Sequence, residues 1–387
     1  MSEANPKKRL FAVLLLVLAG SGFLAYGSAQ FLGNNKGWDI IQVGSTEQLH
    51  CGEDFMISYC LGQGEASASA EKRALSILYT DAAQKAYAMF DTDADSEGYA
   101  NLYHINTHPN EILEVDEGLY DVFRKVEQYD SRFLYLAPVY EYYDNLFYNR
   151  DETAYLLYTG EGNESVAKEY AQSVAYALDP DAVKLELLGN QKVRLFVSEE
   201  YEAYAKEYGI TQYINFYWMK NAFIADYLAD CFMEQGFTHG IINSVDGYTR
   251  NLDDSGESYT VNLPMKVEGG INKEYSLEYQ GPCSLVCFRN YPIVSGEIYY
   301  YQKKDGEYAS RYITPVDGRN VTAMNELVVY SHELSCADLV LLAAPYYVNE
   351  KWDTATDELL SERGAYVLYA QNNTWHASDE NACIRQE

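Results

Sequence analysis

The sequence is poor in basic residues. Lysine and arginine together number 28, against 58 aspartates and glutamates, so the 387-residue chain carries a formal net charge of −30. A surface this acidic repels phosphate backbones, which argues against nucleic acid as a partner. We expect a well-solvated, acidic surface instead.

Cysteine and histidine are also scarce, at 7 and 6 residues. Cys283 and Cys287 are close in sequence, but no second cysteine pair or histidine stands at the spacing of a zinc site. The histidines show no mutual metal spacing, among them His104, His108, His239 and His332. No Ser-His-Asp or Cys-His arrangement can be assembled either. The sequence therefore predicts neither a zinc centre nor a catalytic triad.

Long hydrophobic runs are absent except near the N-terminus. Lys7, Lys8 and Arg9 precede the uncharged, apolar residues 10–26, a pattern typical of an export signal or a signal anchor. Small residues suit cleavage after Ala29, but retention of the segment stays open. We expect residues 1–30 to form this signal, with the rest of the chain secreted or anchored in the cell membrane on its extracytoplasmic side.

The remaining chain shows an α+β pattern. Apolar residues recur at helical spacing in residues 67–90, 117–129, 165–178 and 335–344, and a short helix is expected between Ser198 and Gly209. Residues 184–188 and 193–197 form a hairpin, and strand-like segments dominate after Gly236. We predict a linker at 31–51, a single domain of antiparallel sheets with flanking helices at 52–378, and a tail at 379–387.

Several segments have a distinctive order of residues. Residues 226–243 read as an amphipathic helix, a glycine stop at Gly236 and a buried strand ending in a turn. Four further segments stand out: residues 90–106, a Val-Ser-Gly turn at 294–296, a tyrosine-rich hairpin through residue 318, and Ala-Asp at 337–338. Together they resemble the FAD:protein FMN transferase family, also called the ApbE-type or thiamine-biosynthesis lipoprotein family.

This resemblance implies a function. Members of the family bind FAD and Mg²⁺ outside the cytoplasmic membrane and move FMN onto a threonine hydroxyl of a partner protein, releasing AMP. In such phosphoryl transfer the metal neutralises charge on the diphosphate, while backbone amides and polar groups position it. A protein acceptor of FMN and a membrane contact through the N-terminal segment are the expected partners.

Matching the family's motifs to this chain names the candidate site residues. Where the family has Lys-Gly-Tyr-x-x-Asp, residues 221–226 retain only Asp226, and Lys220 lies one position out of register. Gly-Gly-Asp becomes Val-Asp-Gly at 245–247, and the family's His is replaced by Arg311. The resemblance implies catalytic roles for Arg311 and Asp226. It implies cofactor contacts for a further set of residues, Asn243, Gly247, Ser295 and Gly296.

The metal position is also altered. The family's Asp, followed four residues later by Thr, becomes Asp338 and Leu342, so Asp338 is the one candidate ligand for Mg²⁺. Asp338 also fits a helix-capping pair with Ser335, and Asp226 fits the start of a helix. These replacements argue against the family's reaction.

Two hypotheses remain open. One is a diverged flavin transferase that works with altered ligands. The other is a non-catalytic, surface-exposed protein that uses the same scaffold, and its 38 tyrosines, to bind a partner or a glycan.

Overall fold

The computed structural model describes residues 36–44, 51–149, 164–294 and 296–386. None of the helices within these ranges is long and apolar enough to cross a membrane. The expected signal at 1–30, residues 31–35 and 45–50 of the expected linker, and Ser295 lie outside the described residues. The described part of that linker contains a strand at Gly37–Ile41.

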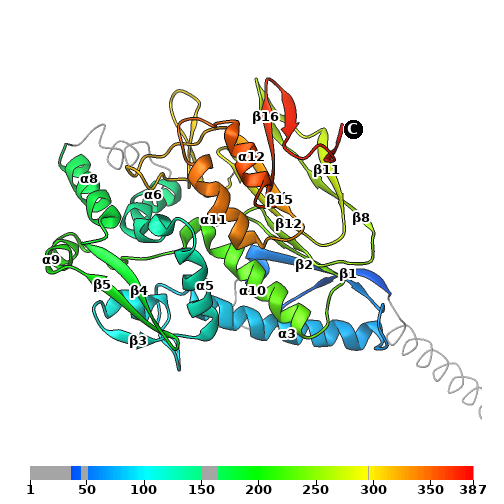
Figure 1. Cartoon of the computed structure of the whole chain (residues 1–387), viewed down its shortest axis with the longest axis horizontal. Coiled ribbons are helices and arrows are strands. Elements are labelled where there is room, and N and C mark those ends of the chain that lie inside the picture. Colours follow the sequence, from blue (N-terminus) through cyan, green and yellow to red (C-terminus); the bar gives the residue numbers. More distant parts are fainter. Residues whose placement is uncertain (1–35, 45–50, 150–163, 295, 387) are drawn as a thin grey trace, which may run out of the picture.

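The largest sheet has eight strands and is antiparallel throughout (Figure 1). In spatial order they are β1 (Gly37–Ile41), β2 (Phe55–Leu61), β6 (Gly240–Ser244), β7 (Tyr248–Asn251), β12 (Cys283–Arg289), β15 (Glu326–Ser331), β16 (Tyr366–Gln371) and β17 (Thr374–Ala377). The sheet thus joins strands from both ends of the domain.

Within the described residues, four smaller sheets contain the other strands. They are β3 (Ile112–Glu114), β5 (Lys192–Val197) and β4 (Val183–Gly189); β18 (Cys383–Gln386), β11 (Tyr275–Gln280) and β8 (Ser258–Asn262); β9 (Met265–Val267) with β10 (Gly270–Asn272); and β13 (Tyr300–Gln302) with β14 (Tyr308–Ser310). Each pairing is antiparallel.

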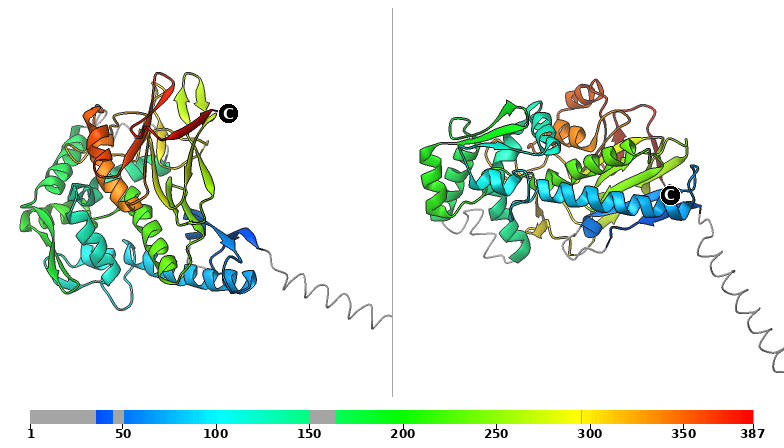
Figure 2. Two further views of the ribbon diagram at one scale, coloured as in Figure 1. Left: turned by 45° about the vertical axis from the view of Figure 1, so that its right-hand side comes forward. Right: turned by 90° about the horizontal axis from the view of Figure 1, so that it is seen from below.

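The helices are α2 (Cys51–Asp54), α3 (Ala68–Met89), α4 (Leu102–Thr107), α5 (Glu117–Glu127), α6 (Ala137–Asn149), α8 (Glu164–Leu178), α9 (Glu199–Tyr208), α10 (Lys220–Glu234), α11 (Cys336–Tyr347) and α12 (Ala355–Ser361), with 3₁₀ turns η1 (Ser131–Leu136) and η2 (Tyr217–Met219). Figure 1 shows α10 and α11 between the large sheet and a lobe built from α5, α6, α8, α9 and β3–β5. Figure 2 shows the long α3 running beside α10.

Tyrosine supplies much of the core. Tyr59, Tyr79, Tyr140 and Tyr248 are fully buried, and so are many leucines and phenylalanines of α10, α11 and the large sheet. Buried tyrosine rings contribute apolar area, while their hydroxyls need hydrogen-bond partners. The Tyr248 hydroxyl, for example, donates to the Trp218 carbonyl at 2.7 Å. The richness in tyrosine is therefore explained in large part by packing.

The expected helices are confirmed, and their ends follow local capping. Ser67, Asp116, Ser198 and Ser335 each accept a backbone N–H at the start of a helix. The tyrosine-rich hairpin expected before residue 318 is formed by the short strands β13 and β14. The expectation that strands come late is only partly right, because β1 and β2 precede α3 and pair into the large sheet.

Candidate functional site

A cavity of about 660 Å³ opens where α6, the start of α10, the β6–β7 turn and the loop after β12 meet. Its lining combines aromatic rings with charged groups. This volume lies within the range of small-molecule sites, about 300–1,000 Å³. Lys220, Asn221, Asp246, Gly296 and Arg311 line it.

The first turn of α10 forms one wall. The helix begins at Lys220, and its N-cap residue Met219 provides no side-chain hydrogen bond to the first N–H groups. The Lys220 ammonium lies 5.5 Å from the centre of the Tyr87 ring. Lys220 makes no ion pair with any described residue. The Lys220 N–H already donates to the Tyr217 carbonyl of η2. The lysine ammonium, which has no ion pair among the described residues, is therefore the group that favours an anion here.

Asp246 is pinned by the residues around it. Its carboxylate accepts from the Asn221 side chain at 2.7 Å and pairs with Arg311 Nη1 at 3.1 Å. Arg311 Nη2 also donates to the Asp246 carbonyl at 2.9 Å. The negative charge of Asp246 is therefore largely neutralised.

Arg311 itself is not placed as a free phosphate clamp. Only 2% of the residue is exposed, and its guanidinium packs on the rings of Tyr299 and Tyr312 at 5.4 and 5.5 Å. Burial would lower the pKa of Arg311, but the neighbouring tyrosines and the Asp246 carboxylate raise it above its usual value, so the guanidinium stays charged. Its Nε and the Asn221 Oδ1 are buried without a hydrogen-bond partner among the described residues. Both residues line the cavity, and a buried polar atom without a partner is uncommon in folded proteins.

The other charges of the cavity are mostly negative. Arg289 pairs with Glu297 at 2.7 Å, whereas Asp54, Asp93 and Asp144, which also line the cavity, form no ion pair within the described residues. Asp54 accepts the Tyr87 hydroxyl, and Asp144 accepts the Tyr217 hydroxyl at 2.5 Å. Burial raises the pKa of Asp144 to about 6, although the Tyr217 hydrogen bond opposes this.

Asp226 lies away from this cavity and has a structural environment. Its carboxylate accepts the N–H groups of Cys336 and Ala337, at 3.0 and 2.8 Å, and pairs with Arg250 at 3.3 Å. Burial raises the pKa of Asp226, while Arg250 and the backbone donors lower it. Asp226 thus ties α10 to the start of α11.

Asp338 is likewise engaged by protein groups. It forms a capping box with Ser335, binds Lys125 Nζ at 2.8 Å and accepts the Tyr129 hydroxyl at 3.2 Å. Burial would raise the pKa of Asp338, but the Lys125 and Ser335 hydrogen bonds bring it below its usual value. A lysine ammonium at this distance occupies the place that a cation would take, so the residues around Asp338 do not fit Mg²⁺.

The residues expected to contact the cofactor do not all lie at the cavity. Gly296 lines the cavity, whereas Asn243 and Gly247 do not. The Asn243 side chain accepts the Thr249 hydroxyl at 2.8 Å. Gly247 has φ +95°, and a Cβ there would lie 2.9 Å from the Cys287 carbonyl oxygen. Gly247 therefore serves the turn and its contact with β12.

Lys220 is the residue that motif matching did not select. Lys220 lies one residue before the position that matches the family's lysine. In the structure it is the first residue of α10 and lines the cavity. The signal available in the sequence was a lysine next to the matched motif.

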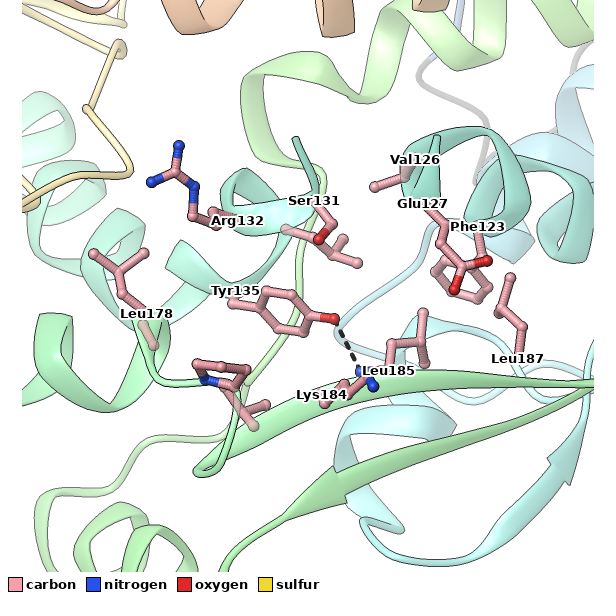
Figure 3. Close-up of a pocket in the computed structure, with 14 residues that line it drawn as sticks. Phe123, Val126, Glu127, Ser131, Arg132, Tyr135, Leu178, Lys184, Leu185 and Leu187 are labelled. Carbon is pink, nitrogen blue, oxygen red and sulfur yellow. Dashed lines mark hydrogen bonds between the residues drawn. The ribbon is translucent and has the colours of Figure 1, made fainter. Parts of the chain in front are cut away.

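A second cavity, of about 300 Å³, is apolar and contains none of the expected site residues. It lies between α5, η1, α8 and β4. Figure 3 shows the Tyr135 ring lying across it, with the hydroxyl accepting the Leu185 N–H at 2.9 Å.

The sequence matches no protein-family model and no curated protein. Solved structures do match. An ApbE protein from Thermotoga maritima has a TM-score of 0.55 and 13% identity, covering 86% of this chain and 93% of its own. The chain has the ApbE fold. The flavin transferase ApbE from Vibrio cholerae matches with a TM-score of 0.55 and 14% identity, covering 88% of this chain and 96% of its own. The apo form of the flavinyl transferase ApbE from Pseudomonas stutzeri matches with a TM-score of 0.54 and 13% identity, covering 89% of this chain and 94% of its own. The ApbE-like fold thus extends over most of the chain.

Proposed function

We propose that this protein is a diverged flavin-transferase-like protein that binds FAD in the 660 Å³ cavity. The observation that carries the proposal is the position of that cavity. The cavity is lined by Lys220, Asn221, Asp246, Gly296 and Arg311. In the sequence, these residues stand at or next to the positions of the ApbE family's motifs. By analogy with the family, the acceptor is a threonine of a partner protein.

The chain's own groups suggest how FAD is held. Lys220 and the first turn of α10 suit the diphosphate, because both present positive charge at a helix start. The aromatic lining, which includes Tyr217, Tyr299 and Tyr300, suits a planar ring system. Asp144, a carboxylate with a raised pKa, is a candidate to accept the proton of an acceptor hydroxyl. Bound FAD would supply the diphosphate whose cleavage transfers FMN and releases AMP.

Magnesium is a separate question. Because Lys125 holds Asp338, we assign no step to a metal at that residue. The other cavity carboxylates without an ion pair among the described residues, Asp54 and Asp93, are the alternative ligands for a cation that accompanies the diphosphate.

We further propose that the domain acts outside the cytoplasm, secreted or anchored in the membrane. Residues 7–26, a basic cluster before an apolar run, support this location.

A thermal-shift titration of the purified chain with FAD, with and without Mg²⁺, tests the binding. At a hundredfold excess over Kd, FAD should stabilise the protein by about 2.7 kcal/mol. Lys220→Met should abolish the shift, and Lys192→Met, on the exposed side of β5, should leave it unchanged. If millimolar FAD has no effect in either condition, the proposal fails.

The second candidate is a non-catalytic binding protein on the same scaffold. Its supporting observation is the charge of the cavity, where Asp54, Asp93 and Asp144 lack an ion pair among the described residues and Lys220 is the one comparable cation. Such a site, rich in tyrosine, suits a neutral, hydroxyl-rich ligand such as a glycan. A protein that ignores FAD but is stabilised by neutral oligosaccharides would support it.

A further inference from the structure

The open end of the β6–β7 hairpin brings His239 next to two consecutive aspartates, the first of which follows it by 14 residues in the sequence. His239 directly precedes β6, and Asp253 and Asp254 follow β7. The pairing of Ile241 with Asn251 and a hydrogen bond from Leu252 N–H to the Gly240 carbonyl, 2.8 Å, hold the two ends together.

The three side chains converge on one point. His239 Nδ1 lies 3.2 Å from Asp253 Oδ1 and 3.3 Å from Asp254 Oδ1, and one ligand atom from each residue falls within 4.8 Å of the others. Bonds of about 2.1 Å to a common metal, at angles between octahedral and tetrahedral, separate ligand atoms by about 3.0–3.4 Å. The observed separations to His239 lie within this interval.

The position of Asp253 is set by its surroundings. The Asp253 amide donates to the Asn251 side chain at 2.9 Å, and the Tyr259 hydroxyl donates to Asp253 Oδ2 at 2.5 Å. Ser255 also donates to Oδ2. Oδ1 is left facing His239, so one carboxylate oxygen is oriented toward the point of convergence. Supporting groups of this kind fix metal ligands in place.

The local charge is unbalanced without a further cation. The Asp253 side chain is 2% exposed, and neither Asp253 nor Asp254 pairs with a lysine or arginine in the part of the chain that the structure describes. Two carboxylates thus share a single imidazole. A divalent cation would compensate this charge.

We propose that His239, Asp253 and Asp254 form a binding site for a divalent transition-metal ion such as Zn²⁺. The mixed nitrogen and oxygen donors favour such an ion over Ca²⁺ or Mg²⁺, which prefer oxygen alone. Three protein ligands leave coordination positions open, and the Asp254 side chain, 59% exposed, places them toward solvent. None of the three residues lines the 660 Å³ cavity, so this site is independent of FAD binding.

Calorimetric titration of the EDTA-treated full chain with ZnCl₂ tests the site. The buffer contains millimolar MgCl₂ and NaCl at about physiological ionic strength, roughly 150 mM. These salts suppress non-specific binding of Zn²⁺ to the acidic surface. We expect one Zn²⁺ per chain, with binding weakened at least about tenfold in His239→Ala and in Asp254→Asn. His376→Ala removes an exposed imidazole elsewhere and should bind like the parent.

Visible absorption with CoCl₂ provides the second readout. Co²⁺ bound by one imidazole and two carboxylates should give d–d bands without the near-ultraviolet charge-transfer band of thiolate ligation. These bands should disappear in His239→Ala. Circular dichroism of the metal-free variants checks that they fold. Folded variants that keep full Zn²⁺ affinity, a thiolate band, or a parent chain that binds no Zn²⁺ would each overturn the proposal.

Discussion

At the scale of single residues, Asp226 and Asp338, the two aspartates expected at the active site, are both engaged by protein groups. Asp226 joins two helices, because its carboxylate receives the Cys336 and Ala337 N–H groups and faces Arg250. Removing one partner of a buried pair leaves the other charge uncompensated, which costs about 3–5 kcal/mol. We therefore expect Asp226→Ala to lower the free energy of unfolding by about 3 kcal/mol in urea denaturation. An Asp226→Ala protein of parental stability that had lost activity would point to a catalytic role instead.

Asp338 should contribute stability that depends on pH. Its pKa is lowered in the folded state, so the contribution is complete above the unfolded pKa of about 3.9 and is lost as pH falls through the folded pKa. We expect Asp338→Asn to be about 1–2 kcal/mol less stable than the parent at pH 7, with the difference shrinking below pH 4 (roughly the unfolded pKa). Asp317→Asn, in an exposed pair with Arg319, should change stability by less than about 0.5 kcal/mol.

At the scale of elements, the β6–β7 hairpin depends on a tight approach to β12. Gly247 and Gly296 both have positive φ, +95° and +98°, but only a Cβ on Gly247 would meet another atom, the Cys287 oxygen at 2.9 Å. Gly247→Ala should therefore cost about 2–3 kcal/mol, and Gly296→Ala about 1 kcal/mol, from backbone strain alone. Thermal unfolding of the two variants side by side measures the difference. Equal losses would show that the packing against β12 contributes nothing.

At the scale of the whole molecule, charge repulsion should limit stability. A net charge of −30 produces a repulsion between exposed groups that salt screens over about 10 Å at 0.1 M. We expect the melting temperature to rise by several degrees between about 0.02 and about 0.5 M NaCl, a range over which screening increases strongly. Such a rise corresponds to roughly 1 kcal/mol in the free energy of unfolding. Sucrose of equal osmolality is the control for effects other than screening. A melting temperature that falls with NaCl would contradict the expectation.

Most of the local structure could be predicted from the sequence. The caps at Ser67, Asp116, Ser198 and Ser335 act within a few residues, so the sequence alone locates these helix starts. Short strands such as β7, β9 and β10 could not be read, because three or four residues show too little alternation. The order of segments nevertheless indicated the ApbE-like fold.

The sequence by itself determined the acidic charge, the capped helices and the order of elements, because each depends on composition or on neighbours along the chain. Only the tertiary structure decided which charged groups are paired with each other and which remain available to bind a ligand. Lys125 reaches Asp338 across 213 residues, Arg311 neutralises Asp246 across 65, and His239 meets Asp253 through the pairing of two strands. Ion pairs and ligand sets of this kind depend on distances in space, which spacing along the chain does not encode.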